Sequence, residues 1–168
     1  MTPTDDTMEL RAAIRGARGF TLIELMLVVV IATILLGIAI PSYMSQLRHS
    51  RRIEAKTALL DLAGREERYF STSVNGANYS AVPGDLGLTG AGWPLVVGSG
   101  YYNVTVTACA VGANCGPNAV PGPSFVIQAN PVAGQSQVLD QECTSFSVDS
   151  VGSQFATGSQ TPAYCWRN

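Results

Sequence analysis

Apolar and polar positions divide the chain into a continuous apolar run, an amphipathic stretch and a series of short alternating segments. The apolar run extends from Phe20 to Ile40 and contains one formally charged residue, Glu24. A helix needs roughly 20 apolar residues to cross a bilayer, so this run is long enough to span a membrane. A charge near the centre of such a span costs at least ~2.5 kcal/mol, so Glu24 requires a specific role.

The helical pattern continues beyond the apolar run. Its apolar positions recur at spacings of three, four and seven, which marks one apolar face: Ala55, Ala58, Leu59, Leu62 and Tyr69. We therefore expect one helix from about Phe20 to Phe70, on the order of 75 Å long at ~1.5 Å per residue. Gly37 and Pro41 interrupt this pattern. Because proline removes a backbone hydrogen bond, they predict a kink near residues 37–41.

Alternating segments in the second half predict β-strands. The three segments are residues 101–108, 124–129 and 144–149, and turns rich in Gly, Pro and Asn separate them. One long helix followed by successive strands predicts an α+β fold, with the helix packed on an antiparallel sheet of three to four strands. The expected core joins Val104, Val106, Phe125 or Ile127, Phe146 and Val148 to Ala55, Leu59 and Leu62. Residues 71–100 show no sustained periodicity and predict a long connection with an exposed tip.

Composition and charge exclude several classes of function. The net charge is −2 and 13% of residues are charged, which is not the composition of a protein that binds nucleic acid by bulk charge. His49 is the only histidine, and no nucleophile–base pair accompanies it, so we expect neither an enzyme nor a histidine-based metal site. The glycine-rich residues 84–92 lack the Gly-Lys-Ser/Thr ending of a phosphate loop. We expect no cofactor.

All four cysteines follow the apolar run, which indicates an exported domain in an oxidising compartment. Of the three possible pairings, we favour Cys109 with Cys115, which bracket a length that a hairpin end could close, and Cys143 with Cys165, which bracket the last strand and the C-terminal tail. The larger loop would contribute roughly 3 kcal/mol in the chain-entropy model. A zinc site is the competing interpretation, but the sequence contains no Cys-x-x-Cys pair.

The residues that flank the apolar run bear on its orientation. Residues 1–19 are polar, and Gly37-Ile38-Ala39 is a poor signal-peptidase site, so the run is expected to stay as a permanent anchor. Three arginines flank each side, Arg11, Arg15 and Arg18 before the run and Arg48, Arg51 and Arg52 after it, which leaves the positive-inside rule undecided. The cysteines place the C-terminal side outside. Residues 1–19 are therefore expected in the cytoplasm.

The segment Gly19-Phe20-Thr21-Leu22-Ile23-Glu24 resembles the prepilin processing signal of the type IV pilin family, which includes the pseudopilins of secretion systems. The resemblance implies that a membrane-bound prepilin peptidase cuts between Gly19 and Phe20 and methylates the new amine of Phe20. A plain single-pass anchor is the alternative.

The resemblance also gives Glu24 a role in assembly. It implies that Glu24 meets the N-terminal amine of a neighbouring subunit in the filament, whereas the alternative is a carboxylate that snorkels near its own helix end. A carboxylate in the first turns of a helix that begins at Phe20 is stabilised by the positive helix end. The resemblance further implies that the segment around Gly37 and Pro41 melts or stretches when the helix packs into a filament.

The C-terminal region resembles the disulfide-bounded region of PilE-type minor pilins, in which a cysteine opens the last strand and Cys-Trp nearly closes the chain. Here these are Cys143 and Cys165-Trp166. The resemblance implies three parts: a cytoplasmic leader of residues 1–19, a transmembrane and assembly helix of residues 20–44, and a globular pilin domain of residues 45–168. The Cys109–Cys115 loop departs from the simplest pattern.

Taken with this resemblance, the sequence predicts a structural subunit of a type IV pilus, and a minor one. The expected partners are other pilin subunits, the prepilin peptidase, the pilus assembly machinery and membrane lipid, with a place first in the inner membrane and then in an extracellular pilus. Adhesion, twitching motility and DNA uptake are not separated. A major pilin, a type II secretion pseudopilin and a membrane-anchored periplasmic binding protein are the alternatives.

One basic segment, from Arg48 to Arg52, admits several partners. Lipid headgroups, the acidic residues of another subunit and DNA would all suit its charge. The simplest interpretation is an exposed helix face that makes filament contacts, with DNA the weakest of the possible partners.

Overall fold

The structure is a computed structural model that describes residues 19–73, 78–90, 92–110, 115 and 122–167 of the 168. It divides into two compact units, Met1–Tyr43 and Met44–Asn168.

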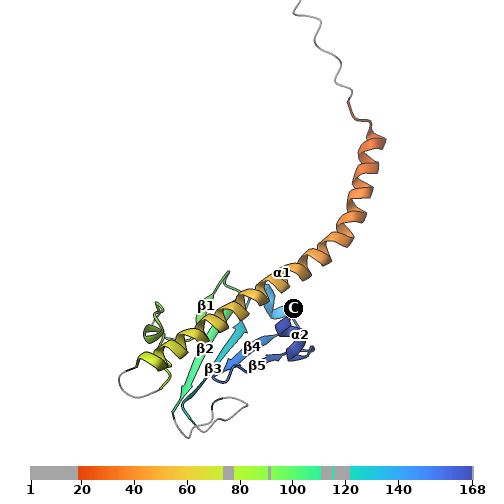
Figure 1. Cartoon of the computed structure of the whole chain (residues 1–168). Coiled ribbons are helices and arrows are strands. Elements are labelled where there is room, and N and C mark those ends of the chain that lie inside the picture. The colour runs from red at the N-terminus through yellow and green to blue at the C-terminus, as the bar shows by residue number, and fades with distance from the viewer. Residues whose placement is uncertain (1–18, 74–77, 91, 111–114, 116–121, 168) are drawn as a thin grey trace, which may run out of the picture. The chain divides into compact units, whose positions relative to one another are not determined.

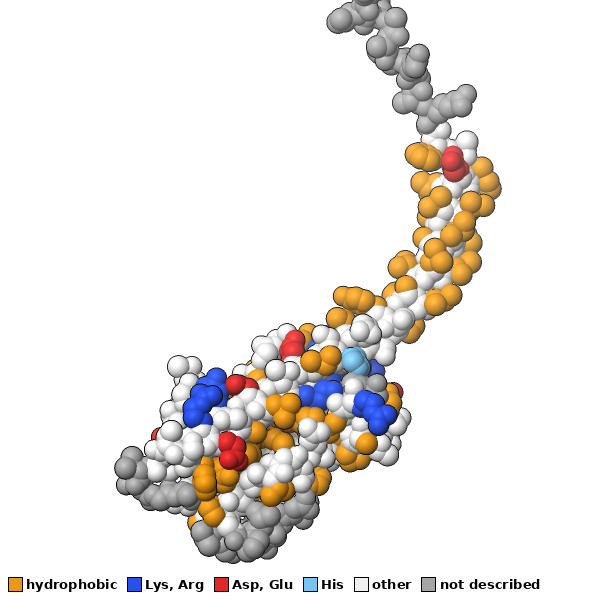
Figure 2. All heavy atoms as spheres, in the orientation of Figure 1, with side chains coloured by type: hydrophobic (Ala, Val, Ile, Leu, Met, Phe, Trp, Pro, Cys, Tyr) orange, Lys and Arg blue, Asp and Glu red, His pale blue; other side chains and the backbone are white. Residues whose placement is uncertain are grey.

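One long helix, α1, runs without interruption over Leu22–Thr72 and contains Pro41. The sequence predicted a helix over Phe20–Phe70, so each end lies two residues further along the chain. The side chains of residues 20–40 are all exposed. The helix α1 is long enough to cross a membrane, and its mean hydropathy is high enough. Apolar side chains cover this part of the helix, with one acidic side chain among them (Figure 2). The kink near residues 37–41 stays a prediction.

A five-stranded antiparallel sheet forms the second layer of the domain. Its strands are β1 Leu95–Val97, β2 Tyr102–Cys109, β3 Ser124–Pro131, β4 Ser145–Asp149 and β5 Gln154–Thr157. Each strand pairs with the next, in the order β1-β2-β3-β4-β5, so the sheet is a simple meander. The α+β fold and the three long strands are confirmed. The two edge strands were missed because three and four residues are too few to show an alternating pattern.

The core lies between the sheet and the part of α1 that follows Met44, which crosses one face of the sheet (Figure 1). Alternate residues of β2, β3 and β4 point toward the helix and are buried. The core contains every residue predicted for it, with Phe125 and Ile127 both included. Burying a side chain the size of Val, Leu or Phe stabilises a fold by about 1.5–3 kcal/mol, so these contacts hold the helix on the sheet.

Short helices fill two of the connections and the C-terminus: η2 Pro83–Leu86, η3 Ser136–Leu139 and α2 Pro162–Arg167. The long connection predicted over residues 71–100 is shorter in the structure, because α1 extends to Thr72 and β1 begins at Leu95, with η2 between them. The turn that follows β1 is tied to α1, since the backbone N–H and hydroxyl of Ser99 donate to the Glu54 carboxylate at 2.9 and 2.8 Å. Gly98 allows this approach with a φ of 55°.

Candidate functional site

The first described residues are exposed, are not helical, and directly precede α1. Gly19, Phe20 and Thr21 precede the helix, and the side chain of Phe20 is 82% exposed. The Thr21 hydroxyl accepts the backbone N–H of Glu24 at 3.2 Å and so caps the helix N-terminus. The Gly19–Phe20 peptide therefore lies outside regular structure and next to a capped helix start. Residues 1–18, which include Arg18, lie outside the described residues.

Glu24 is the acidic residue in the first turn of α1. Within the described part of the chain, no hydrogen bond or ion pair holds its side-chain carboxylate. Its position fits the helix macrodipole, because unpaired N–H groups at a helix N-terminus stabilise negative charge. The apolar side chains around it are exposed, so the carboxylate lies in an apolar surface and has no hydrogen-bond or ion-pair partner among the described residues.

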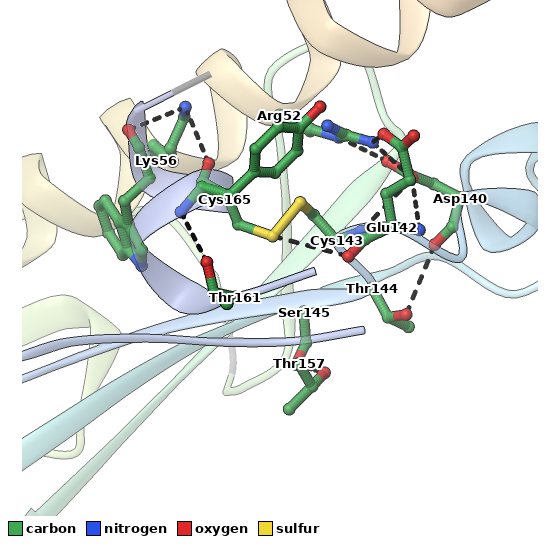
Figure 3. The surroundings of a disulfide bond; sticks show 12 residues. Arg52, Lys56, Asp140, Glu142, Cys143, Thr144, Ser145, Thr157, Thr161 and Cys165 are labelled. Atoms are coloured by element: carbon green, nitrogen blue, oxygen red, sulfur yellow. Dashed lines mark hydrogen bonds and ion pairs between the residues drawn. A yellow bond between two sulfur atoms is a disulfide. The ribbon is translucent and has the colours of Figure 1, made fainter. Parts of the chain in front are cut away.

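The structure contains two disulfides, Cys109–Cys115 and Cys143–Cys165, which is the pairing favoured from the sequence. The second bond joins the segment before β4 to α2 and so closes the last two strands into one loop (Figure 3). Trp166 packs edge-on against the buried ring of Phe146 and donates its indole N–H to the Phe155 carbonyl at 2.9 Å. The C-terminus is thereby fixed to the sheet.

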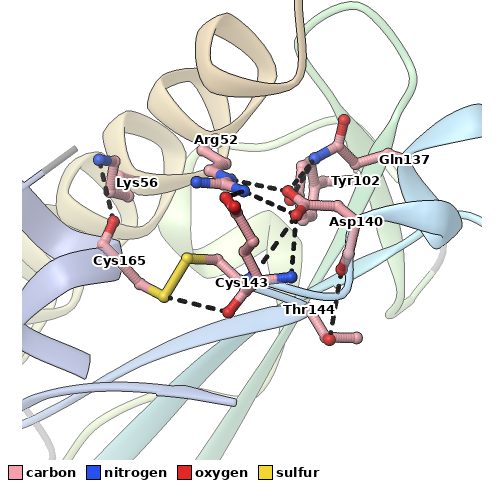
Figure 4. Close-up of polar contacts among 9 residues, drawn as sticks. Arg52, Lys56, Tyr102, Gln137, Asp140, Cys143, Thr144 and Cys165 are labelled. Carbon is pink, nitrogen blue, oxygen red and sulfur yellow. Dashed lines mark hydrogen bonds and ion pairs between the residues drawn. A yellow bond between two sulfur atoms is a disulfide. The ribbon is translucent and has the colours of Figure 1, made fainter. Parts of the chain in front are cut away.

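A buried ion pair fastens this disulfide-closed region to α1. The guanidinium of Arg52 donates to both carboxylate oxygens of Asp140 at 2.7 Å, and it also donates to Glu142 at 2.8 Å. Gln137 donates to Asp140 at 2.9 Å and to the Tyr102 hydroxyl at 3.1 Å (Figure 4). The hydrogen bond to Asp140 is the main reason that the pKa of Arg52 is raised, so this arginine stays charged.

The lysine of α1 completes the same attachment. Lys56 donates to the carbonyls of Cys165 and Trp166, both at 3.3 Å, and these carbonyls lie in the last turn of α2 (Figure 3). A cation at a helix C-terminus compensates the negative end of the helix dipole. Burial, and next the charge of Arg52, lower the pKa of Lys56. Arg52 and Lys56 thus hold both sides of the Cys143–Cys165 bond against α1.

The expectation of an exposed polar face from Arg48 to Arg52 is wrong for Arg52, which is buried because loop carboxylates cover it. Arg51 is also engaged: it donates to the Ser136 hydroxyl at 2.8 Å and its guanidinium lies 3.5 Å from the centre of the Tyr101 ring. One signal for the ion pair was present in the sequence. Arg52 stands three residues before Ala55, on the same stripe as Leu59 and Leu62.

A second charged residue is buried at the other end of that stripe. Glu66 is fully buried, and one of its carboxylate oxygens accepts the backbone N–H of Ser80 at 3.1 Å. The other oxygen has no partner in the described part of the chain. Burial raises the pKa of Glu66 to about 7, and the negative charges of Glu67 and Asp85 act in the same direction.

The predicted site residues fall in both units. Gly19, Phe20, Glu24, Gly37 and Pro41 belong to the first, and the four cysteines belong to the second. No cluster of His, Cys, Asp or Glu that could hold a metal ion occurs among the described residues.

Comparison with known proteins gives two family matches. Residues 41–147 match the family described as type IV minor pilin ComP, DNA uptake sequence receptor. Residues 14–40 match the prokaryotic N-terminal methylation motif. The chain is also 50% identical over 54 residues to the type IV major pilin protein PilA of Myxococcus xanthus strain DK1622, which covers 32% of this chain and 24% of that protein. This match therefore spans about a quarter of the relative's length.

Proposed function

The chain belongs to the ComP family of type IV minor pilins, and on that premise we propose that it is a structural subunit of a type IV pilus. The observation that carries the proposal is the N-terminal segment: a methylation motif over residues 14–40 leads into an apolar helix with one carboxylate near its start. The α+β domain and its disulfides are consistent with an exported subunit. Its role is structural rather than catalytic.

Processing at the Gly19–Phe20 bond is the first step of this function. The prepilin peptidase would cut the bond and methylate the amine of Phe20, and residues 1–19 would be the discarded leader. The exposure of Phe20 and the absence of regular structure at Gly19 support access to this bond. Cleavage would leave the Phe20 amine close to the capped start of α1.

Assembly is the second step, and Glu24 is the residue that we assign to it. A carboxylate that has no partner among the described residues is available to the methylated amine of a neighbouring subunit. Pairing would neutralise two charges that a filament core would otherwise bury alone, and an uncompensated buried charge is strongly destabilising. The assembly machinery of the inner membrane would drive insertion, because this sequence offers no nucleotide-binding loop.

The topology follows from the same features. Residues 20–44 would anchor the subunit in the inner membrane before assembly, with residues 45–168 in the periplasm, where the two disulfides can form. Residues 1–19 would lie in the cytoplasm until they are removed.

DNA reception is the second candidate function, and the description of the matched family favours it. Binding of DNA depends on Lys and Arg that neutralise backbone phosphates. Residues 69–166 contain no Lys, Arg or His, and three of the cations in α1, Arg51, Arg52 and Lys56, already serve contacts within the domain. The charge distribution therefore supports the structural role more strongly than DNA contact.

Deletion of the gene tests the proposed function against the pseudopilin alternative. A pilus subunit predicts fewer surface pili, or loss of a pilus-dependent activity, with protein secretion unchanged. A secretion defect with intact pili would contradict the proposal. A restored phenotype on expression of the full chain, but not of a chain that lacks residues 20–40, is the matched control.

A further inference from the structure

The face of the sheet that points away from α1 carries hydrogen-bonding side chains in rows and no exposed charge. The strand register places Thr105, Gln128, Ser147 and Phe155 side by side across β2 to β5. A second row contains Val96, Asn103 and Asn130. Adjacent strands lie about 4.8 Å apart, so each row presents side chains at regular intervals.

These side chains are not used by the fold. Asn103, Thr105, Gln128, Asn130 and Ser147 are exposed or half-buried. Their side chains make no hydrogen bond to the described part of the chain. Amide and hydroxyl groups left open in this way can donate and accept at once.

The absence of charge distinguishes this face from an ordinary solvated sheet. Globular proteins carry about 25% charged residues, and this chain carries 13%. Of the four charged residues between 69 and 166, Asp140 and Asp149 are buried, Glu142 pairs with Arg52, and Asp85 accepts the Ser80 hydroxyl. None of them stands exposed in either row.

The two rows contain uncharged hydrogen-bond donors and acceptors, which limits the kinds of partner that this face could bind. A polyphosphate such as DNA requires cations, which the sheet lacks. An apolar partner such as a lipid surface or another protein's hydrophobic face requires a large exposed apolar patch, whereas the central positions of both rows are polar. A neutral polymer rich in hydroxyl groups matches these side chains, and the half-buried aromatic side chain of Phe155 stands at the end of one row.

We propose that this outer face of the sheet binds a neutral polysaccharide, with Gln128 and Asn130 as the principal hydrogen-bonding residues and Phe155 as an aromatic platform. The polymer would lie across the strands, so that successive sugar hydroxyls meet successive side chains of a row. The proposal concerns the single chain and not the filament, so its failure would leave the proposed pilus function standing.

The test uses the purified full chain in detergent micelles, with insoluble cellulose and soluble dextran as neutral polysaccharide probes and duplex DNA at low salt as the competitor. We expect at least one polysaccharide to bind. The double variant Gln128→Ala, Asn130→Ala should bind roughly tenfold more weakly, because two amide contacts are lost. The matched control is Gln160→Ala, which removes the same chemical group from the exposed turn before α2 and should bind like the unchanged chain.

Thermal unfolding checks that the double variant is folded, which we expect because neither side chain lies in the core. If it is not, hydrogen exchange of the unchanged chain with added dextran provides the comparison, and protection should centre on β2 to β4. The proposal is overturned if neither polysaccharide binds, if Gln160→Ala weakens binding as much as the double variant does, or if duplex DNA displaces the polysaccharide.

Discussion

Arg52 and Glu66 show how the domain uses charge inside its core. Both stand on the stripe of α1 that faces the sheet, beside Ala55, Leu59 and Leu62. Arg52 is satisfied by two carboxylates, whereas Glu66 receives one backbone N–H. Two buried ionisable groups on one helix therefore have opposite consequences for stability.

Replacement of Arg52 should be strongly destabilising. Arg52→Met leaves the buried Asp140 carboxylate without its cation, and the loss of unfolding free energy should be about 3–5 kcal/mol in denaturant titrations of the full chain. Arg65→Met is the matched control: it removes an i,i+4 ion pair with the exposed Asp61 carboxylate and one hydrogen bond to the Leu86 carbonyl, and the expected loss is about 1–2 kcal/mol. Equal losses in the two variants would contradict a buried pair. The double variant Arg52→Met, Asp140→Leu should recover part of the lost stability.

Glu66 should make the free energy of unfolding fall as the pH rises. This is opposite to the usual effect of a carboxylate, whose pKa is lowered in the folded state. Its pKa is raised to about 7 in the folded state, so the folded chain binds more protons than the unfolded chain between about pH 4.5 and 7. The contribution of Glu66 to the free energy of unfolding should be largest below pH 4.5. It should fall by up to about 3 kcal/mol as the pH rises through 7. Glu66→Gln should remove this dependence in unfolding measurements across that range. An unchanged pH profile in the variant would contradict the assignment.

At the residue scale, the sequence predicted the apolar core but not its charged members. The spacing of apolar residues in α1 identifies the helix face that packs on the sheet, and the same spacing includes positions 52 and 66. Sequence reasoning does not place Arg or Glu in a core, because these residues are almost always exposed unless they are paired. The partners of Arg52 lie almost 90 residues further along the chain, in a loop without periodicity. Contacts of that range are set by the fold and leave no local pattern.

The two disulfides act on elements of different size, and their removal should differ accordingly. Cys143–Cys165 closes a separation of 22 residues and Cys109–Cys115 a separation of 6. In the chain-entropy model, Cys143→Ala with Cys165→Ala should lose about 3 kcal/mol, and Cys109→Ala with Cys115→Ala about 2 kcal/mol. Chemical denaturation of the full chain measures both. A greater loss for the smaller loop would contradict the view that the larger bond secures β4, β5 and α2.

Elements were predictable where they are long. The helix and the three long strands have enough residues to show a period, and the structure confirms all four. Three elements have only three to six residues each: β1, β5 and α2. The position of β1 depends on its pairing with β2, and that of β5 on its pairing with β4. The position of α2 depends on the cap that Lys56 provides. Tertiary contacts rather than local pattern create these short elements.

At the scale of the whole molecule, the chain combines an exposed apolar helical segment with a domain that has its own hydrophobic core. Each carboxylate described in the domain accepts a hydrogen bond within it, whereas the Glu24 carboxylate accepts none from the described residues. The family could be predicted from residues 19–24 and the helix that follows. The kind of pilus-dependent activity could not, because it depends on surfaces that carry no motif.

Glu24→Ala should separate anchoring from assembly. The variant should still reach the membrane and lose its leader, since the apolar run and the Gly19–Phe20 bond are unchanged, but its incorporation into pili should fall at least roughly tenfold. The ratio of subunit in sheared pili to subunit in membranes measures this. Glu67→Ala, at an exposed position of the domain, is the matched control and should incorporate normally. Normal incorporation of Glu24→Ala would contradict its role.

We propose that this chain is processed at Gly19 and built into a filament from Phe20 onward. Mass spectrometry of surface pili sheared from cells tests it directly. We expect a subunit whose first residue is N-methylated Phe20, with residues 1–19 absent and both disulfides intact. A subunit that retains residues 1–19, a chain cut beyond the apolar run, or absence of the chain from the pili would contradict it.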